Sequence, residues 1–167
     1  MILKKLTKNF YISFIIIFLI FSLDRISKLY VVYLNKNNYA LELFLSKFLN
    51  ISLIWNEGIA FGLLSFNESY IYNIITLIII SISIIIMVIM FNSEGFKKYS
   101  LIFVFGGSIS NLFDRIYYSA VPDFIDLHYK SFHWFIFNMA DIFITFGVIC
   151  LIFAEIFYKN NEYEKNI

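Results

Sequence analysis

The sequence predicts an all-α membrane protein, with four transmembrane helices and a small platform outside the membrane between the first and second of them. Hydrophobic residues make up 60% of the 167 residues, and the mean hydropathy is +0.78. Ordinary soluble domains are only roughly half apolar. The segment from Ser69 to Ser93 carries no charged residue, and about 20 apolar residues cross the hydrocarbon core of a bilayer. An ordinary soluble domain is therefore excluded.

Four hydrophobic segments are long enough to form membrane helices. We place them at about residues 10–34, 69–91, 99–118 and 134–158. The first segment follows several lysines, as in a signal peptide, but no small-residue cleavage site comes after it, so we interpret it as an uncleaved span. No internal repeat or linker divides the chain, and we expect a single integral membrane domain over residues 1–167.

Lysines outside the spans predict the orientation of the chain. With four spans, the two termini and the connection between the second and third spans lie on one side of the membrane. Lysines concentrate in these three places: Lys4, Lys5, Lys8, Lys97, Lys98, Lys159 and Lys165. The positive-inside rule makes that side cytoplasmic, so both termini are expected in the cytoplasm and the loops at residues 35–68 and 119–133 outside.

The two outer loops carry structural signals of their own. Residues 49–53 alternate between apolar and polar side chains, which predicts a short strand with one buried face. The many apolar residues of the first outer loop indicate a platform that lies on the membrane. Pro122 is the only proline and cannot continue a helix interior, so the chain is expected to leave helical geometry just before Asp123.

Polar residues of three spans fall at one predicted depth, towards the outer leaflet. They lie in the second half of the outward-running first span, at the end of the outward-running third span and near the start of the inward-running fourth span: Asp24, Arg25, Lys28, Asn111, Asp114, Arg115, Asn138 and Asp141. An ionisable residue at bilayer depth is costly and by default indicates a functional site. Scattered structural residues would not be expected to align in this way.

Two of the carboxylates have cations nearby. Asp24 and Lys28 are four residues apart on one helical face, which favours a buried ion pair that stabilises the helix bundle. Asn111, Asp114 and Arg115 also share a face. Arg115 could donate to a carboxylate or to backbone carbonyls of a bound chain, so structural and substrate-positioning roles stay equally open. Because a nearby cation lowers a carboxyl pKa, Asp24 and Asp114 are poor candidates for proton transfer.

Asp123 and Asp141 differ, because neither has a cation within a helical turn. Apolar surroundings or a second carboxylate would raise their pKa values. If the two carboxylates meet, they could share a proton, with one as general base on water and the other as general acid. Asp126 stays a third candidate at this point.

Other chemistries have weaker support. His128 and His133 are five residues apart, whereas metal ligands on a helix usually come at i and i+4, so no metal site is predicted. A serine nucleophile with Lys28 as its base is conceivable, but no serine stands in a distinctive turn. Cys150 lies in an apolar run and is expected to be a small buried hydrophobe. No basic tract indicates a nucleic-acid partner.

Five segments taken together resemble the lipoprotein signal peptidases (signal peptidase II), which are membrane aspartic proteases of bacteria. In chain order they are residues 24–28, similar to the family's Asp-x-x-Ser/Thr-Lys; 56–62, similar to Asn-x-Gly-x-Ala-Phe; 106–115, similar to Gly-Gly-x-x-Gly-Asn-x-x-Asp-Arg; and 121–124 and 137–141, which match the two catalytic segments. Any one segment alone would be a weak signal, but their common order makes the resemblance specific over nearly the whole chain. Ser110 departs from the pattern by replacing its third glycine.

The resemblance implies that Asp123 and Asp141 are the catalytic dyad, and it decides against Asp126. It implies positioning roles, towards the substrate or the dyad, for Asn56, Gly58, Asn111, Arg115 and Asn138, with structural support from Asp24, Lys28 and Asp114. The family's loop between the first two spans forms a small β-cradle on the membrane, which suits the strand predicted above. No metal and no cofactor are expected.

The implied activity is removal of signal peptides from diacylglyceryl-modified prolipoproteins, with cleavage on the N-terminal side of the lipidated cysteine. A monomer among the lipids of a bacterial inner membrane is expected, with its active site towards the outer leaflet. The alternative is a small proton- or ion-coupled transporter lined by the buried charges, and a non-catalytic scaffold is a third hypothesis. The single depth of the charges, the uncharged second span and the lack of a repeat speak against transport.

Overall fold

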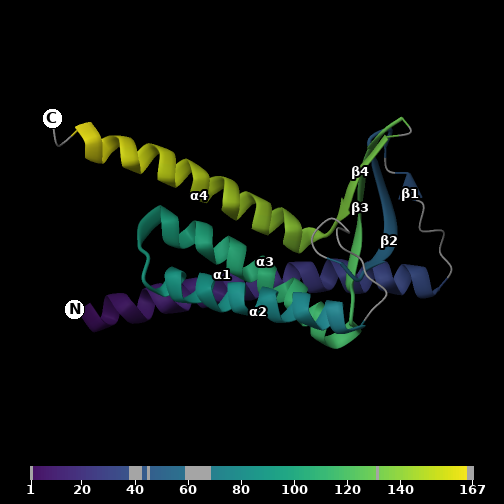
Figure 1. Cartoon of the computed structure of the whole chain (residues 1–167), viewed down its shortest axis with the longest axis horizontal. Coiled ribbons are helices and arrows are strands. Elements are labelled where there is room, and N and C mark those ends of the chain that lie inside the picture. Colours follow the sequence, from purple (N-terminus) through teal and green to yellow (C-terminus); the bar gives the residue numbers. More distant parts are fainter. Residues whose placement is uncertain (1, 38–42, 45, 59–68, 131, 165–167) are drawn as a thin grey trace.

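A computed structural model describes residues 2–37, 43–44, 46–58, 69–130 and 132–164. Within these ranges four helices are present: α1 (Ile2–Lys36), α2 (Ser69–Phe91), α3 (Gly95–Tyr118) and α4 (Met139–Glu164). A small sheet stands at one end of the helices (Figure 1). The central helix is α3, which packs against the other three.

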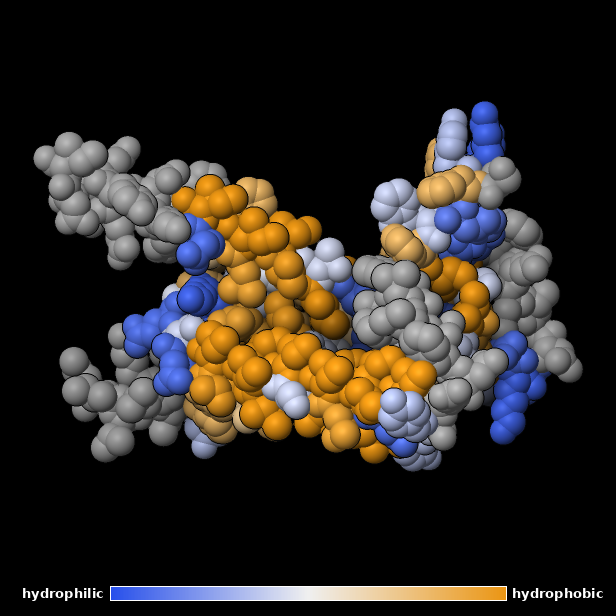
Figure 2. All heavy atoms as spheres, viewed as in Figure 1, coloured by the Kyte–Doolittle hydropathy of each residue, from blue (hydrophilic) through white to orange (hydrophobic). Residues whose placement is uncertain are grey.

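Three of the described helices contain segments long and apolar enough to cross a membrane: Phe10–Lys36, Tyr70–Phe91 and Met139–Ile156. Their outer faces expose large apolar side chains, among them Phe18 (58%), Ile85 (57%) and Ile152 (54%). Figure 2 shows a continuous apolar surface over the helices. Contiguous apolar surface of this extent is rare on a monomeric soluble protein, and it suits contact with lipid tails.

The helix α3 is not among these three segments. It carries a polar face that is buried against its neighbours, including Ser100, Ser110, Asp114 and Arg115. Polar residues that face the interior of a membrane bundle lower the hydropathy of a helix without exposing charge to lipid. The lower hydropathy of α3 is therefore explained by its central position, where its polar face is covered by other helices.

The sheet contains, within the described residues, the strands β1 (Leu43–Phe44), β2 (Leu49–Asn56), β3 (Val121–Tyr129) and β4 (Phe132–Phe137). Neighbours pair antiparallel in the order β1-β2-β3-β4. The strand predicted at residues 49–53 is confirmed within β2. The expected cradle between the first two helices is only half of the sheet, because β3 lies in the predicted loop at residues 119–133 and most of β4 lies in the predicted fourth span.

The predicted fourth span, residues 134–158, needs a correction at its start. Residues Phe132–Phe137 form β4, and α4 begins only at Met139. A short apolar run fits a buried helix and a strand equally well by composition. The aromatic residues here pair with β3, and the side chain of Trp134 is 62% exposed. The chain therefore enters the fourth helix directly from the sheet.

The connection between α3 and β3 is tight. α3 ends at Tyr118, and Ser119 adopts a left-handed backbone conformation (φ 58°). The prediction that the chain leaves helical geometry before Asp123 is confirmed. Pro122 lies near the start of β3, opposite Trp55 of β2. This turn lets the end of α3 and the start of β3 lie next to each other.

Glycines bring α3 and α4 into close contact. A Cβ atom on Gly107 of α3 would lie 2.6 Å from the carbonyl oxygen of Ala140 and 2.7 Å from the side chain of Ile144. One on Gly147 of α4 would lie 2.7 Å from the carbonyl oxygen of Ser100. Small residues of this kind allow helix backbones to approach closely in membrane bundles. The approach at Gly107 brings the first turn of α4 against the polar face of α3.

Candidate active site

Buried polar side chains gather where the first turn of α4 meets the second half of α1, the end of α3, and the strands β2 and β3. Those less than a tenth exposed are Asp24, Lys28, Asn56, Ser110, Asp114, Arg115, Asp123, Asn138 and Asp141. Asn111 and Gly58 join them through hydrogen bonds. The structure thus brings together residues from all five of the segments that the sequence singles out.

The first turn of α4 is fixed by a reciprocal pair of hydrogen bonds. The backbone N–H of Asp141 donates to the amide oxygen of Asn138 (3.2 Å), and the backbone N–H of Asn138 donates to Oδ2 of Asp141 (3.1 Å). This is a capping box, in which the residue before a helix and its third residue satisfy each other. Asn138 therefore caps α4 from the position just before it. The sequence had suggested instead that Asn138 lies inside the fourth helix. The cap fixes where the Asp141 carboxylate lies.

A second carboxylate stabilises the same helix start. The backbone N–H of Ala140 donates to Oδ1 of Asp24, 2.9 Å away on α1. The first N–H groups of a helix have no partner within it, and a negative charge near them is favourable. Asp24 therefore anchors the N-terminus of α4 to α1.

Asp123 lies on β3 and is 3% exposed. Its carboxylate oxygens accept hydrogen bonds from the side-chain amides of Asn138 (2.6 Å) and Asn56 (2.8 Å). Burial, and after it the charge of Asp141, raise the pKa of Asp123 to about 6, while the two amides act in the opposite direction. Asn138 thus contacts both carboxylates. Asp123 and Asp141 lie close enough for the charge of one to change the proton affinity of the other.

The turn after β2 orients Asn56. Its amide oxygen accepts the N–H of Gly58 (2.8 Å), which leaves the amide N–H₂ facing Asp123. Nη2 of Arg115 donates to the carbonyl oxygen of Gly58, and the guanidinium lies 5.6 Å from the centre of the Tyr72 ring. Nη1 of Arg115 is buried and has no hydrogen-bond partner among the described residues. Arg115 thus stabilises the turn at Gly58, and its Nη1 is a donor that a bound carbonyl could use.

Asp126 does not join Asp123 and Asp141. Successive side chains of a strand point to opposite faces, so residues three apart on β3 face opposite ways. The carboxylate of Asp126 instead contacts Nδ1 of His133 on β4, at 2.8 Å. The strand geometry excludes it from the pair on physical grounds, which the spacing in the sequence could not do.

Asn111 links Asp141, and through it the pair of Asp123 and Asp141, to the cation of Lys28. Its side-chain amide donates to Oδ1 of Asp141 (2.9 Å), and its amide oxygen accepts a hydrogen bond from Nζ of Lys28 (2.7 Å). The amide is therefore oriented by charges of opposite sign at its two ends. Asn111 thus links Asp141 to Lys28, and among the described residues the ion pairs of Lys28 are with Asp24 and Asp114 instead.

Four charged residues form what we call the charge cluster: Asp24, Arg25, Lys28 and Asp114. Nζ of Lys28 lies 2.7 Å from Asp24 and 2.8 Å from Asp114, which confirms the predicted pair between Asp24 and Lys28. The guanidinium of Arg25 contacts both oxygens of Asp114, at 2.5 and 2.6 Å. Two cations and two carboxylates thus neutralise each other between α1 and α3.

Ser110, where the family pattern has a glycine, belongs to the same network. Its hydroxyl donates to Oδ2 of Asp24 at 2.5 Å, and the residue is completely buried. Nothing in the spacing of the sequence indicates the contact, because it joins residues 86 positions apart.

A groove of about 400 Å³ runs from Asp141 along α4 and is closed on its other side by the sheet. It is lined almost entirely by apolar side chains: Leu127, Trp134, Phe137, Ile142, Thr145, Phe146 and Ile149, with Asp141. Figure 2 shows the surface hollowed between α4 and the sheet. A ligand with an apolar body could therefore lie against the Asp141 carboxylate.

The chain is similar to known proteins over most of its length. A family profile described as "Signal peptidase (SPase) II" matches residues 16–157. The lipoprotein signal peptidase of Pelagibacter ubique (strain HTCC1062) is 49% identical over 95% of this chain and 96% of its own, and that of Anaplasma marginale (strain Florida) is 38% identical over 90% and 88%. A solved structure described as a bacterial membrane enzyme superposes with a TM-score of 0.69 and 27% identity, covering 89% of this chain and 90% of its own. The chain belongs to the signal peptidase II family, the lipoprotein signal peptidases.

Proposed function

We propose that this protein is a membrane aspartic endopeptidase that removes signal peptides from diacylglyceryl-modified prolipoproteins, on the N-terminal side of the lipidated cysteine. The observation that carries the proposal is the shared contact of Asn138 with Asp123 and Asp141. Both carboxylates are buried, and the groups that donate hydrogen bonds to them are neutral amides. This is the environment in which two carboxylates hold one proton between them.

The chemistry follows from that shared proton. The ionised carboxylate takes a proton from a water molecule as the water oxygen attacks the scissile carbonyl. The protonated carboxylate gives its proton to the developing oxyanion, which yields a gem-diol. As the carbon–nitrogen bond breaks, the first carboxylate passes the proton it took from water to the leaving amine, and a hydroxyl of the gem-diol returns a proton to the second carboxylate. The apparent pKa values of such a pair belong to the pair and not to either residue. Burial and the charge of Asp141 raise the pKa of Asp123 to about 6, which supports a pair that keeps a proton above the ordinary range of an aspartate.

Positioning roles follow from the contacts. Asn56, Asn111 and Asn138 hold the carboxylates, and Gly58 orients Asn56. Nη1 of Arg115, which has no hydrogen-bond partner among the described residues, would donate to a backbone carbonyl of the bound peptide. The apolar groove beside Asp141 suits the apolar parts of a lipid-modified substrate.

We further propose that all four helices cross a bacterial inner membrane, with both termini in the cytoplasm and the sheet outside. α3 would cross because its polar face is covered by the other helices. Lys97 and Lys98 in the first turn of α3 favour a cytoplasmic position for the start of that helix. The sheet would then form the extracytoplasmic cradle over the active site. A monomer surrounded by membrane lipids stays a prediction.

The transporter hypothesis loses its support, because the charge cluster neutralises itself in one layer and does not line a path.

The test is cleavage of a diacylglyceryl prolipoprotein by the purified protein. The variants Asp123→Asn and Asp141→Asn should each lower kcat/KM by about 10³-fold or more, because each removes a proton-transfer group. The matched control is Glu155→Gln, a carboxylate-to-amide change at an exposed position of α4, which should process the substrate at the wild-type rate. Wild-type activity in both aspartate variants would disprove the mechanism.

A further inference from the structure

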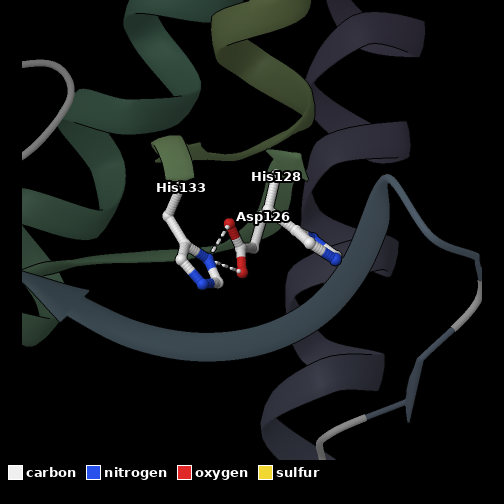
Figure 3. Close-up of side chains that lie close together, drawn as sticks. All are labelled: Asp126, His128 and His133. Atoms are coloured by element: carbon white, nitrogen blue, oxygen red, sulfur yellow. Dashed lines mark hydrogen bonds and ion pairs between the residues drawn. The ribbon is translucent and has the colours of Figure 1, made fainter. Parts of the chain in front are cut away.

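A second group of titratable side chains lies on the hairpin of β3 and β4, apart from the candidate active site. Asp126 and His128 come from β3, and His133 comes from β4 (Figure 3). Each offers one ligand atom, and these atoms all lie within 4.8 Å of one another. Nδ1 of His133 is 2.8 Å from Oδ2 and 3.1 Å from Oδ1 of Asp126.

The register of the hairpin explains why the three side chains meet. Asp126 and His128 are alternate residues of β3, which favours the same face. The pairing with β4 shifts register between them, but their ligand atoms still lie close together (Figure 3). His133 is the cross-strand partner of His128, and the two rings stack with their centres 5.3 Å apart. The spacing of five residues between the histidines argues against a metal site only on a helix. On an antiparallel hairpin the same spacing makes them direct neighbours.

We propose that Asp126, His128 and His133 bind a divalent transition-metal ion of the zinc type. Two imidazole nitrogens and one carboxylate oxygen are a ligand set that zinc prefers, and three protein ligands leave a fourth position for water. Zinc holds nitrogen and oxygen ligands at about 2.0–2.2 Å, so binding would draw the three ligand atoms closer together than their present spacing of up to 4.8 Å.

Two further observations support a ligand at this place. Nδ1 of His128 is buried and has no hydrogen-bond partner among the described residues, and buried polar atoms normally have one. The side chain of His133 is 53% exposed and that of Asp126 only 5%. The site therefore has a buried anionic end, which would neutralise part of the metal charge, and an open side towards solvent.

The position also predicts a consequence of binding. His128 also lines a hollow of about 420 Å³ with Lys47, Phe48, Tyr129 and Lys130. An ion held by the three side chains would join β3 to β4. β3 carries Asp123, and β4 leads directly to Asn138, so metal binding would stiffen the hairpin from which both carboxylate segments depart. The inference rests on the hairpin alone and does not depend on the proposed peptidase activity.

The experiment uses the full-length protein, purified in a non-ionic detergent with an affinity tag that contains no histidine. Zinc chloride is titrated by calorimetry, and cobalt chloride is titrated with its visible absorption as the readout. His128 and His133 are the only histidines of the chain, so histidine-type ligation of cobalt can arise only here. We expect one ion per chain, with a dissociation constant on the order of micromolar, and a rise of a few degrees in the melting temperature at saturating zinc.

Single variants separate the site from adventitious binding. His128→Ala, His133→Ala and Asp126→Asn should each weaken zinc binding by at least about tenfold and abolish the rise in melting temperature. Glu94→Gln, which removes an exposed carboxylate near the opposite end of α3, should bind zinc as the wild type does. Absence of saturable binding by the wild type, or binding that both histidine variants retain, would overturn the proposal and leave His133 and Asp126 as a simple ion pair.

Discussion

Two groups of buried aspartates lie within one hydrogen-bond network, and they differ in the partners they have. In the charge cluster, Asp24 and Asp114 contact Lys28 and Arg25 at 2.5–2.8 Å. Asp123 and Asp141 accept hydrogen bonds from amides instead. A cation favours the ionised form of a carboxyl group, whereas burial beside a second carboxylate favours the protonated form. We propose that the partner, and not the residue type, separates structural from catalytic aspartates in this protein.

The two groups are also joined. Asn111 stands between Lys28 and Asp141, and Asp24 holds the backbone of Ala140 next to Asp141. The charge cluster thus acts on the active site by fixing the position of α4. It has no need to take part in proton transfer.

The largest effect on stability is expected from Lys28→Met. The change leaves two buried carboxylates with only the cation of Arg25, and breaking a buried ion pair from one side typically costs about 3–5 kcal/mol. The melting temperature in detergent should fall accordingly. The double variant Lys28→Met with Asp114→Asn restores the charge balance and should recover part of the loss. A double variant that is no more stable than the single one would contradict the structural role of the cluster.

The next effect concerns Asn138, which both caps α4 and holds Asp123. Asn138→Ala should lower kcat/KM by about 100-fold, since displacement of a catalytic group by about 1 Å can have this effect. It should also cost about 1 kcal/mol of stability through loss of the cap.

Asn138→Ser separates the two roles. Serine is a good N-cap, but its hydroxyl does not reach as far as the amide that contacts Asp123. Stability should therefore return in this variant while activity does not. Recovery of both would mean that Asn138 acts only as a helix cap.

The pH dependence of kcat/KM tests the contrast between aspartates paired with cations and aspartates held by amides. Because the pKa of Asp123 is raised to about 6, the pair keeps its shared proton below that pH and loses it as the pH rises through it. Activity should therefore decline on the alkaline side with a midpoint near pH 6, well above the ordinary pKa of an aspartate. In Asn56→Ala one donor to the ionised carboxylate is absent, so the decline should move to higher pH. A shift to lower pH would show that the amide does not act on Asp123.

The sequence predicts the parts of this protein that depend on length, charge and short-range spacing. The uncharged second span and the Asp24–Lys28 pair depend on such features, and both are present in the structure. The strand β4 was missed, because an aromatic run such as Phe132 to Phe137 has no periodicity that separates a strand from a helix. Its pairing partner lies on β3, and only the fold brings the two together.

The candidate site divides in the same way. The absence of adjacent cations marks Asp123 and Asp141 in the sequence, but their proximity depends on the cap at Asn138, which the sequence placed inside a helix. The family resemblance decides against Asp126, but a physical reason to exclude it appears only once β3 is known to be a strand. The contact of Ser110 with Asp24 joins helices whose relative rotation no local pattern determines.

The smallest effect is expected at Ser110. Ser110→Ala removes the hydroxyl that donates to Asp24, and a hydrogen bond to a charged group contributes about 1.5–3 kcal/mol at most. Because Lys28 and the N–H of Ala140 still hold Asp24, we expect a loss of about 1 kcal/mol and kcat/KM within about threefold of wild type. Ser110→Gly, which restores the family residue, should lose about a further 1 kcal/mol through helix propensity.

Comparison of these two variants by thermal melting separates the hydrogen bond from the backbone effect. If the glycine variant were as stable as the wild type, the serine hydroxyl would contribute nothing, and its position would reflect packing alone. If instead either variant lost activity as strongly as Asn138→Ala, the charge cluster would act on proton transfer directly. The division between paired and amide-held aspartates would then have to be abandoned.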